Sequence, residues 1–273
     1  MNANVSSNPV VGLTTFIRHR ELLSELIKRD FIGRYKGSVL GVGWSLFNPL
    51  LMLAVYTLVF SVAFKARWNT PDDGKLSFAI VLFSGMIIHA FFAECINRAP
   101  TLILSNPSYV KKVVFPLEIL PIVTLCSALL HFVVSFAVLL GFCIIAGASV
   151  YIDTLMLPII LLPLILMALG FSWLLASLGV YLRDLAQAVT MLSTVLIFLA
   201  PVFYPITALP VAYQGYIKWN PITLPVNQFR EIMLFGTTPN WIDWLVAFVI
   251  SLLIYCFGYW WFQHTRKGFA DVI

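Results

Sequence analysis

The chain alternates long apolar runs with short polar segments, and the lengths of the runs indicate membrane spans. A transmembrane helix needs about 20 consecutive, mostly apolar residues. Six runs reach this length: residues 39–64, 76–96, 117–147, 155–182, 185–209 and 241–262. The chain has 60% hydrophobic and only 11% charged residues, whereas about a quarter of the residues in a soluble domain are charged. We therefore predict an all-α integral membrane protein with six spans.

The segment before the first run has the pattern of an amphipathic helix. Thr14 or Thr15 can cap a helix that continues to Ile32. At 100° per residue, the apolar residues of this helix fall on one side and its charged residues on the other. The pattern predicts an interfacial helix that lies on the membrane surface, packs on a soluble partner, or does both.

The basic residues indicate the orientation of the chain in the membrane. Of the 17 Lys and Arg residues, twelve fall on the side that carries both termini, and cytoplasmic loops are enriched in basic residues. Both termini are therefore expected in the cytoplasm. The twelve are Arg18, Arg20, Lys28, Arg29, Arg34, Lys36, Arg98, Lys111, Lys112, Arg183, Arg266 and Lys267. The expected layout is a cytoplasmic N-terminal region at 1–38, a six-span domain at 39–262 and a cytoplasmic tail at 263–273.

The loop between the second and third runs, residues 97–116, contains a short amphipathic pattern. Asn106 and Pro107 form a helix start, and about two turns can follow before the next proline ends them. Lys111 and Lys112 lie beside apolar positions. The pattern admits two interpretations: a helix that docks into a groove of a soluble partner, or a basic loop that fixes topology.

The segment after the fifth run, residues 210–240, is apolar and aromatic but is interrupted by Pro and Gly. Its pieces are too short to span a membrane and too apolar for a solvated loop. Irregular backbone at membrane depth needs protein or a water-filled cavity around it. We therefore expect re-entrant or interfacial helices that form the outer mouth of a passage.

Few ionisable residues fall within or near the spans: His89, Glu94, Glu118 and His131. His89 and Glu94 are about 140° apart around a helix and do not share a face. We expect the two glutamates to pair with basic residues at the cytoplasmic surface, namely Arg98, Lys111 or Lys112. For His131 we expect a neutral imidazole bonded to a neighbouring helix rather than a catalytic role. We identify no catalytic residues and no metal site from the sequence, and it contains no GxxxxGK(S/T) loop for ATP phosphates.

Several motifs occur in an order that resembles a known family: RDFIGRYKGSVLGVGWSLFNP, NPSYVKKVVFPLEILP, YLRD, APVFYP and WNPITLPVNQFREIMLFG. Over residues 21–267 the chain resembles the membrane subunit of bacterial ABC exporters for polysaccharides, which include the O-antigen permease Wzm and the teichoic acid and capsule permeases. The resemblance implies a type 2 ABC exporter architecture and a homodimer paired with two copies of a nucleotide-binding ATPase, which holds the ATP and Mg. It implies a transport subunit without a cofactor of its own, rather than an enzyme, that moves a lipid-linked polysaccharide, first of all O-antigen, across the bacterial inner membrane. No nucleic-acid partner is expected.

Three sets of site residues follow from the residue types and the resemblance. In relatives the N-terminal helix and the 97–116 loop touch the ATPase, which implies an ATPase-coupling set: Asn106, Ser108, Tyr109, Lys111 and Lys112. Near the cytoplasmic entrance, cations can bind a lipid diphosphate headgroup or anionic membrane lipids; this set is Arg29, Arg34 and Lys36. Aromatic rings stack on sugar C–H faces, and the resemblance places spans one and five along the route. The expected glycan path contains Trp44, Tyr56, Phe60, Phe203 and Tyr204.

Other functions stay open at this point. The cargo can be teichoic acid, a capsule polysaccharide, a drug or a small lipid instead of O-antigen. A membrane-embedded glycan acyltransferase with His89 or His131 as the base would act without ATP. A proton-coupled secondary transporter is a further alternative, although the sequence has no evident inverted repeat.

Overall fold

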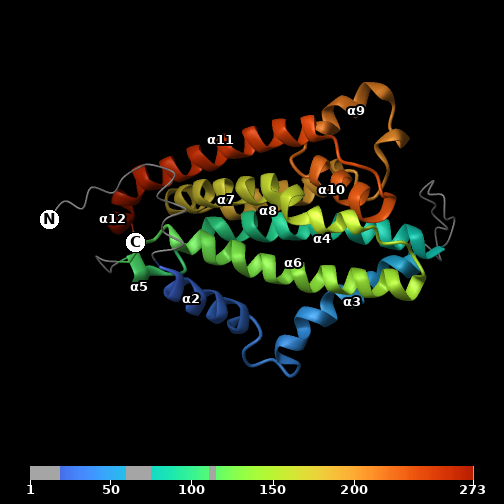
Figure 1. Ribbon diagram of the computed structural model, residues 1–273. Helices are drawn as coiled ribbons and strands as arrows, with labels where there is room; N and C mark the ends of the chain where they lie inside the picture. Colours follow the sequence, from blue (N-terminus) through green and yellow to red (C-terminus); the bar gives the residue numbers. More distant parts are fainter. Residues whose placement is uncertain (1–18, 60–74, 111–114, 273) are drawn as a thin grey trace.

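The computed structural model describes residues 19–59, 75–110 and 115–272. Every regular element in these ranges is a helix, and the longest helices lie side by side in one bundle (Figure 1). The α-helices are α2 (Arg20–Gly33), α3 (Trp44–Tyr56), α4 (Lys75–Arg98), α5 (Pro107–Val110), α6 (Ile119–Ala146), α7 (Leu157–Tyr181), α8 (Leu185–Leu199), α9 (Val211–Lys218), α10 (Thr223–Arg230), α11 (Trp241–Thr265) and α12 (Phe269–Val272). The prediction of an all-α fold is confirmed.

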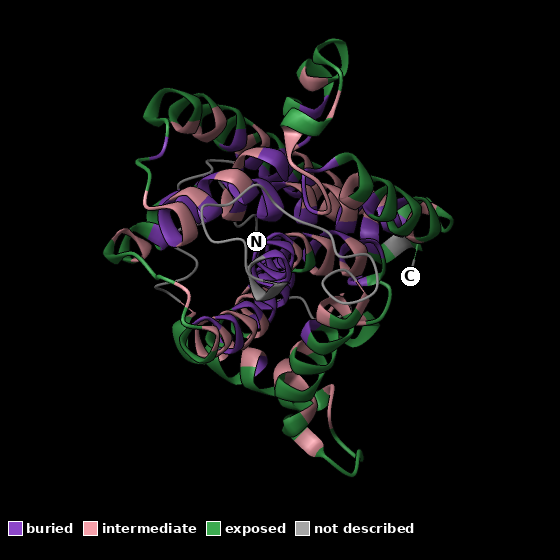
Figure 2. Ribbon diagram, turned by 90° about the vertical axis from the view of Figure 1, so that its right-hand side faces the viewer, coloured by how far each residue is buried: buried purple, intermediate pink, exposed green. Residues whose placement is uncertain are grey.

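Helix α4 forms the centre of the bundle. In the candidate span Phe78–Thr101, which contains most of α4, 78% of the most apolar 18 residues are buried. It packs against α6, α7, α8 and α10. In an end-on view, buried residues gather in the middle and exposed residues form the periphery (Figure 2). Trp173 of α7 is fully buried in this core and packs its ring against Tyr255 and Tyr259 of α11. Its indole N–H donates to the carbonyl of Glu118 at 3.1 Å, which satisfies the one polar atom of the ring.

Helices α7 and α11 touch through their backbones because both carry glycine at the crossing. A Cβ added at Gly258 would lie 2.1 Å from the carbonyl oxygen of Gly170, closer than any real contact. Small residues at such crossings let membrane helices approach closely. The pair Gly170 and Gly258 therefore sets the spacing of α7 and α11.

Among the described residues, five helical segments are long and apolar enough to cross a membrane: Gly41–Val59, Phe78–Thr101, Ile119–Ala146, Ile152–Tyr181 and Trp241–Gly268. They match five of the six predicted spans. The segment expected at 185–209 forms the 15-residue helix α8, which is about 22 Å long and shorter than the roughly 30 Å hydrocarbon core. Helix α8 ends before Ala200. The backbone of Ala200 is extended, which is the conformation favoured before a proline, here Pro201. The count of six spans stays a prediction.

Helices α2 and α3 form a V beside the bundle, with the turn between them farthest from it (Figure 1). Gly37 and Gly41 in this turn have φ angles of +86° and +52°, which favour glycine. Leu23 and Leu26 of α2 are buried where α2 packs on α6. The expected contact of α2 with the membrane surface or with a soluble partner stays a prediction. In the candidate span Gly41–Val59, which contains α3, only 11% of the most apolar 18 residues are buried. The predicted caps Thr14 and Thr15 lie outside the described residues.

The segment at 210–240 folds into two short helices, α9 and α10, followed by a π-helical turn at Glu231–Phe235. Helix α10 packs into the bundle against α4 and α7. Helix α9 projects from the same end of the molecule (Figure 1). The depth of this segment in the membrane, and thus its re-entrant character, stays a prediction.

Candidate coupling and translocation site

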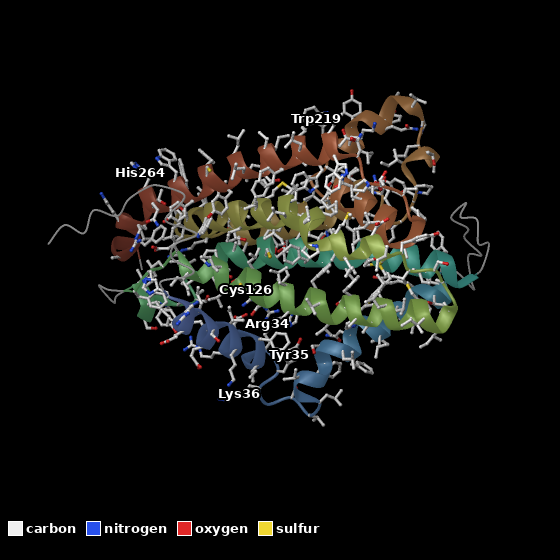
Figure 3. All side chains as sticks on the ribbon, viewed as in Figure 1. Arg34, Tyr35, Lys36, Cys126, Trp219 and His264 are labelled. Atoms are coloured by element: carbon white, nitrogen blue, oxygen red, sulfur yellow. The ribbon has the colours of Figure 1, made fainter. Side chains whose placement is uncertain are left out.

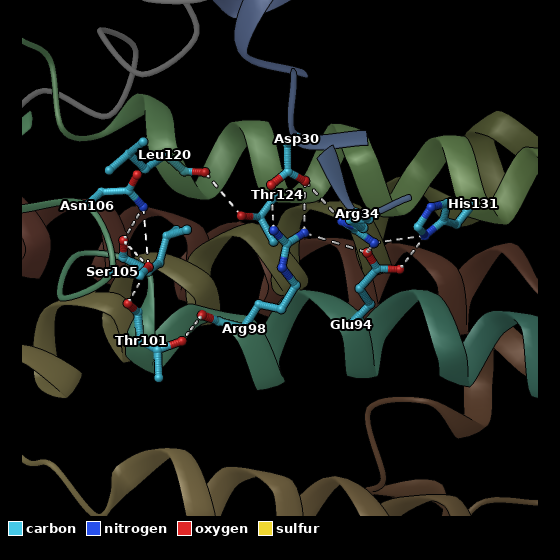
Figure 4. Close-up of polar contacts among 11 residues, drawn as sticks. Asp30, Arg34, Glu94, Arg98, Thr101, Ser105, Asn106, Leu120, Thr124 and His131 are labelled. Carbon is cyan, nitrogen blue, oxygen red and sulfur yellow. Dashed lines mark hydrogen bonds and ion pairs between the residues drawn. The ribbon is translucent and has the colours of Figure 1, made fainter. Parts of the chain in front are cut away.

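A cluster of charged side chains joins the end of α2 to α4 and α6 (Figure 4). We define the charge cluster as Asp30, Arg34, Glu94, Arg98 and His131. Arg98 of α4 donates to both carboxylate oxygens of Asp30, from Nη1 at 3.0 Å and from Nη2 at 2.6 Å. Such a two-pronged guanidinium–carboxylate pair is among the strongest hydrogen-bonded contacts in proteins. It fixes the orientation of α2 against α4.

Arg34 extends the charge cluster from Asp30 to α4 and α6. Its Nη2 donates to Asp30 at 3.1 Å, and its Nη1 pairs with the carboxylate of Glu94. His131 Nδ1 lies 3.0 Å from Arg34 Nη1 and 3.1 Å from Glu94 Oε2. The imidazole Nδ1 can therefore accept from the guanidinium or donate to the carboxylate, according to its tautomer. As predicted, His131 is bonded to neighbouring helices, and its Nε2 also lies 3.0 Å from the Tyr35 hydroxyl.

The two carboxylates of the cluster match its two guanidinium groups in number, which lowers the cost of holding these charges half-buried. Burial by itself would raise the pKa of Asp30, but the hydrogen bonds and charge of Arg98, together with the charge of Arg34, lower this pKa to about 2. Asp30 is therefore ionised throughout the physiological pH range. Loss of one partner would leave another charge unpaired in a partly buried site.

The second glutamate has a different partner from the one predicted. Glu118 accepts from Arg266 Nη1 at 2.9 Å, whereas we expected Arg98, Lys111 or Lys112. The reason is tertiary packing, because the end of α11 returns beside the start of α6. Lys111 and Lys112 lie outside the described residues. Glu94 does contact Arg98, at a longer N–O distance of 3.7 Å.

The short helix α5 contacts α2 directly. Arg29 of α2 donates to the Tyr109 hydroxyl at 2.5 Å, and its guanidinium carbon lies 5.7 Å from the centre of the Tyr109 ring. Phe115 stacks on the Tyr109 ring, with the ring centroids 4.3 Å apart, and thereby fixes the position of that ring. Asn106 Nδ2 donates to the Leu102 carbonyl at 2.9 Å and braces the turn before α5. The two segments expected to meet a soluble partner are thus joined to each other.

Within the ATPase-coupling set, Ser108 is exposed beside the half-buried Tyr109. The three expected headgroup cations do not surround a common point. Arg29 binds Tyr109, and Arg34 lies inside the charge cluster. Lys36 is exposed and points away from the bundle, whereas Arg34 and Tyr35 point towards it (Figure 3).

The described residues expected along the glycan path belong to two separate parts of the chain, helix α3 and the segment that follows α8. Trp44 and Tyr56 belong to α3, which packs on α4 and α6. Phe203 and Tyr204 follow α8, which packs on α4 and α7. The Phe203 ring stacks on Phe198 at 5.5 Å, and the Tyr204 hydroxyl donates to the Phe198 carbonyl at 2.9 Å. Phe60 lies outside the described residues.

Arg230 is a buried residue that the sequence analysis did not predict to be functional. It is not among the twelve basic residues expected on the cytoplasmic side, so it was assigned to the outer side. It is only 2% exposed and extends from α10 towards α4 and the end of α8. It donates to the Val81 carbonyl at 2.8 and 3.0 Å, to the Pro201 carbonyl at 2.6 Å and to the Val202 carbonyl at 3.0 Å. The available signal was its place in the 210–240 segment, which was expected to be too apolar for a solvated loop.

His89 has a backbone partner on the neighbouring helix. Its Nε2 lies 3.1 Å from the carbonyl oxygen of Ser193 in α8. Glu94 faces the charge cluster instead, so the prediction that the two side chains do not converge is confirmed. Both histidines offered as a catalytic base are therefore engaged with neighbouring helices.

This architecture is that of a polytopic helical membrane protein whose amphipathic helix α2 is joined to the short loop helix α5. The chain belongs to the ABC-2 type transporter family, whose model matches residues 21–234. It is similar to the O-antigen export system permease protein RfbA of Myxococcus xanthus, with 26% identity over 258 residues, 94% of this chain and 96% of that protein. The RfbA protein of Klebsiella pneumoniae is 24% identical over 254 residues, 93% of this chain and 95% of that protein. The polysialic acid transport protein KpsM of Escherichia coli is 24% identical over 215 residues, 77% of this chain and 80% of that protein.

Proposed function

We propose that this chain is the membrane-spanning subunit of an ATP-driven exporter that moves a lipid-linked polysaccharide from the cytoplasm across the bacterial inner membrane. The proposal is supported by membership of the ABC-2 type transporter family and by relatives whose names denote O-antigen export and polysialic acid transport. The relatives named for O-antigen export match over more than nine-tenths of both chains. O-antigen is therefore the first cargo to test, and capsule polysaccharide is the second.

The observation that carries the coupling part of the proposal is the contact between Arg29 of α2 and Tyr109 of α5. A partner ATPase that pushes on either helix acts on both, because this contact joins them. The charge cluster then transmits the movement, since Asp30 and Arg34 hold α2 to Arg98 and Glu94 of α4. In this mechanism ATP is bound and hydrolysed on two copies of a separate subunit.

The path for the glycan is proposed to form between two copies of the chain. Within one chain the aromatic residues of α3 belong to a helix that packs on α4 and α6, whereas those after α8 follow a helix that packs on α4 and α7. A shared path needs the α3 of one copy and the α8 of another, or a rearrangement of one chain. The exposed apolar face of α3, with Leu46, Phe47 and Leu50 between 44% and 49% exposed, is available for such an assembly.

The test is to purify the tagged chain from its native membrane, identify what accompanies it and measure ATP hydrolysis. We expect a stoichiometric P-loop ATPase and two copies of the chain. Deleting the gene is expected to remove the polysaccharide from the cell surface and to leave its lipid-linked form on the cytoplasmic side. A lone chain without ATPase activity, together with unchanged surface polysaccharide, would refute the proposal.

A further inference from the structure

A groove of about 660 Å³ opens beside α2, facing the turn to α3 and the middle of α6. Two parallel rows of α2 side chains line it, each with a spacing of four residues. Leu23, Ile27 and Phe31 form an apolar row, and Arg20, Ser24 and Lys28 form a polar row. Residues four apart on a helix lie one above the other. One wall of the groove is therefore apolar along its length, while the neighbouring strip is polar and basic.

The remaining lining residues extend the apolar wall. Val42 borders the groove from the turn before α3, Leu130 borders it from α6, and Ile32 adds to the α2 side. Val42 and Leu130 are 44% and 42% exposed, so the described part of the chain leaves these side chains uncovered. An occupant of this groove must bring its own apolar surface.

The polar row contributes two cations whose charges are not neutralised within the described residues. Arg20 and Lys28 are exposed, and neither has an ion pair with a described side chain. In contrast, Arg34 and Arg98 are held by carboxylates. The acidic residues of α2 that face outwards, Glu21 and Glu25, do not line the groove. Arg20 and Lys28 are separated by about 12 Å along the helix axis, so they can contact a headgroup at two points.

We propose that this groove binds an anionic glycerophospholipid, with acyl-chain segments against the apolar row and the phosphate headgroup beside Arg20 and Lys28. The charge pattern requires a ligand that is apolar along one side and negative along the other, and α2 is the helix whose amphipathic pattern places it at the membrane surface. The groove volume is in the range of ordinary small-ligand sites, about 300–1,000 Å³. This size suits short stretches of acyl chain rather than an entire polyprenyl chain.

The bound lipid would brace α2 beside the charge cluster. Phe31, at one end of the apolar row, has its ring centre 5.0 Å from that of His131. Leu23 and Leu26 are buried where α2 packs on α6, and Leu23 also borders the groove. A lipid in the groove fills the adjacent side, so the position of α2 depends on the membrane as well as on protein contacts. This inference does not depend on the cargo or on the ATPase.

The experiment is native mass spectrometry of the full chain, titrated after delipidation with phosphatidylglycerol or with phosphatidylcholine. We expect selective retention of phosphatidylglycerol. The double variant Arg20→Gln/Lys28→Gln should weaken this retention by roughly tenfold or more, because each basic residue near the headgroups adds substantially to anionic-lipid attraction. Val42→Trp, which obstructs the groove and leaves every charge in place, should weaken it independently. The matched control Arg183→Gln/Lys267→Gln, which removes two exposed cations elsewhere on the predicted cytoplasmic side, should retain wild-type binding.

Three results would overturn the proposal. Equal retention of both lipids, or an equal effect of the control variant, would mean that the membrane attracts the chain without a specific site. A nitroxide attached at Ser24→Cys that reports a second copy of the chain within the groove, with lipid absent, would assign the groove to a protein interface. A polyprenyl diphosphate that displaces phosphatidylglycerol through the same two cations would assign it to the substrate lipid.

Discussion

Arg98 donates to both carboxylate oxygens of Asp30, at 2.6 and 3.0 Å, and thereby joins the amphipathic helix α2 to the central helix α4. The Asp30 side chain is 23% exposed and the Arg98 side chain 32%. This contact is therefore shielded enough to contribute to stability, unlike most ion pairs on protein surfaces. It also lies where a push on α2 would reach the bundle.

We expect Asp30→Asn to weaken the attachment of α2 because the amide keeps one acceptor and loses the charge. A hydrogen bond to a charged group contributes about 1.5–3 kcal/mol to stability. We therefore expect the free energy of unfolding to fall by an amount of this order, measured by thermal unfolding. Hydrogen exchange of α2 should increase more than that of α7. Glu21→Gln, which neutralises an exposed carboxylate of the same helix, is the matched control. Equal protection of α2 in both variants would contradict the assigned role of the contact.

The low pKa of Asp30 predicts how this contribution depends on pH. The pKa is about 2 in the folded chain and about 3.9 in an unfolded one. Because folding lowers the pKa, the contribution is fully present above pH 3.9 and is lost as the pH falls towards 2. The stability difference between the wild type and Asp30→Asn should therefore be the same at pH 7 and pH 5. Chemical denaturation of both proteins at pH 7 and pH 5 measures this difference. A smaller stability difference at pH 5 than at pH 7 would contradict the low pKa of Asp30.

The contact between Arg29 and Tyr109 predicts a graded loss of coupling. Tyr109→Phe removes the hydroxyl acceptor and keeps the ring on Phe115, whereas Tyr109→Ala also removes the stacking. We expect the amount of glycan exported per ATP hydrolysed to fall for Phe and to fall further for Ala. The reconstituted complex, assayed for both quantities, provides the measurement. Tyr216→Phe, at an exposed tyrosine of α9, serves as the control, and equal effects of all three variants would contradict the prediction.

Sequence patterns predict the long helices well because hydrophobic length and amphipathicity are local properties. The runs that became α4, α6, α7 and α11 needed no tertiary information. The polar contacts were harder to predict. Glu118 pairs with Arg266, which is 148 residues away, and only the return of α11 to the start of α6 brings them together.

The charge cluster illustrates the same limit within the candidate site. Asp30 and Arg34 are one helical turn apart, so their pairing follows from the sequence. Their contacts with Glu94, Arg98 and His131 depend on how α2 crosses α4 and α6, which no spacing along the chain specifies. The glycan-path residues show the complementary case, since they were proposed from a resemblance and the positions of α3 and α8 within one chain do not by themselves form a shared path.

The glycine contact between α7 and α11 leads to a prediction about packing. A Cβ at Gly258 would collide with the backbone of α11's partner helix at Gly170, and overpacking of this kind costs about 1–3 kcal/mol. Gly258→Ala is therefore expected to lower the thermal unfolding temperature. Gly141→Ala, in α6 where no atom of a neighbouring described residue lies within 4 Å of the added Cβ, should leave stability unchanged or raise it. A fluorescence-based thermal unfolding assay in detergent can compare them, and equal unfolding temperatures would contradict the packing argument.

Arg230 predicts a specific requirement at the other end of the bundle. Its guanidinium donates to carbonyl oxygens of Val81, Pro201 and Val202, and so joins α10 to α4 and to the segment that follows α8. Lysine keeps the charge but offers a single nitrogen, which cannot reproduce the planar fork of donors. Arg230→Lys should therefore lower stability nearly as much as Arg230→Met. Gly85→Ala should also lower stability, because the added Cβ would lie 2.6 Å from Arg230 Nη2.

The readout that separates this role from a generic charge effect is local. Hydrogen exchange in the Arg230 variants should increase first in α10 and around Pro201, where the carbonyl oxygens lose their donors. Lys218→Met, which removes an exposed cation of α9, should leave both regions protected. If Arg230→Lys kept wild-type protection in α10, the charge alone would suffice, and the fork of hydrogen bonds would not be what holds α10 against the bundle.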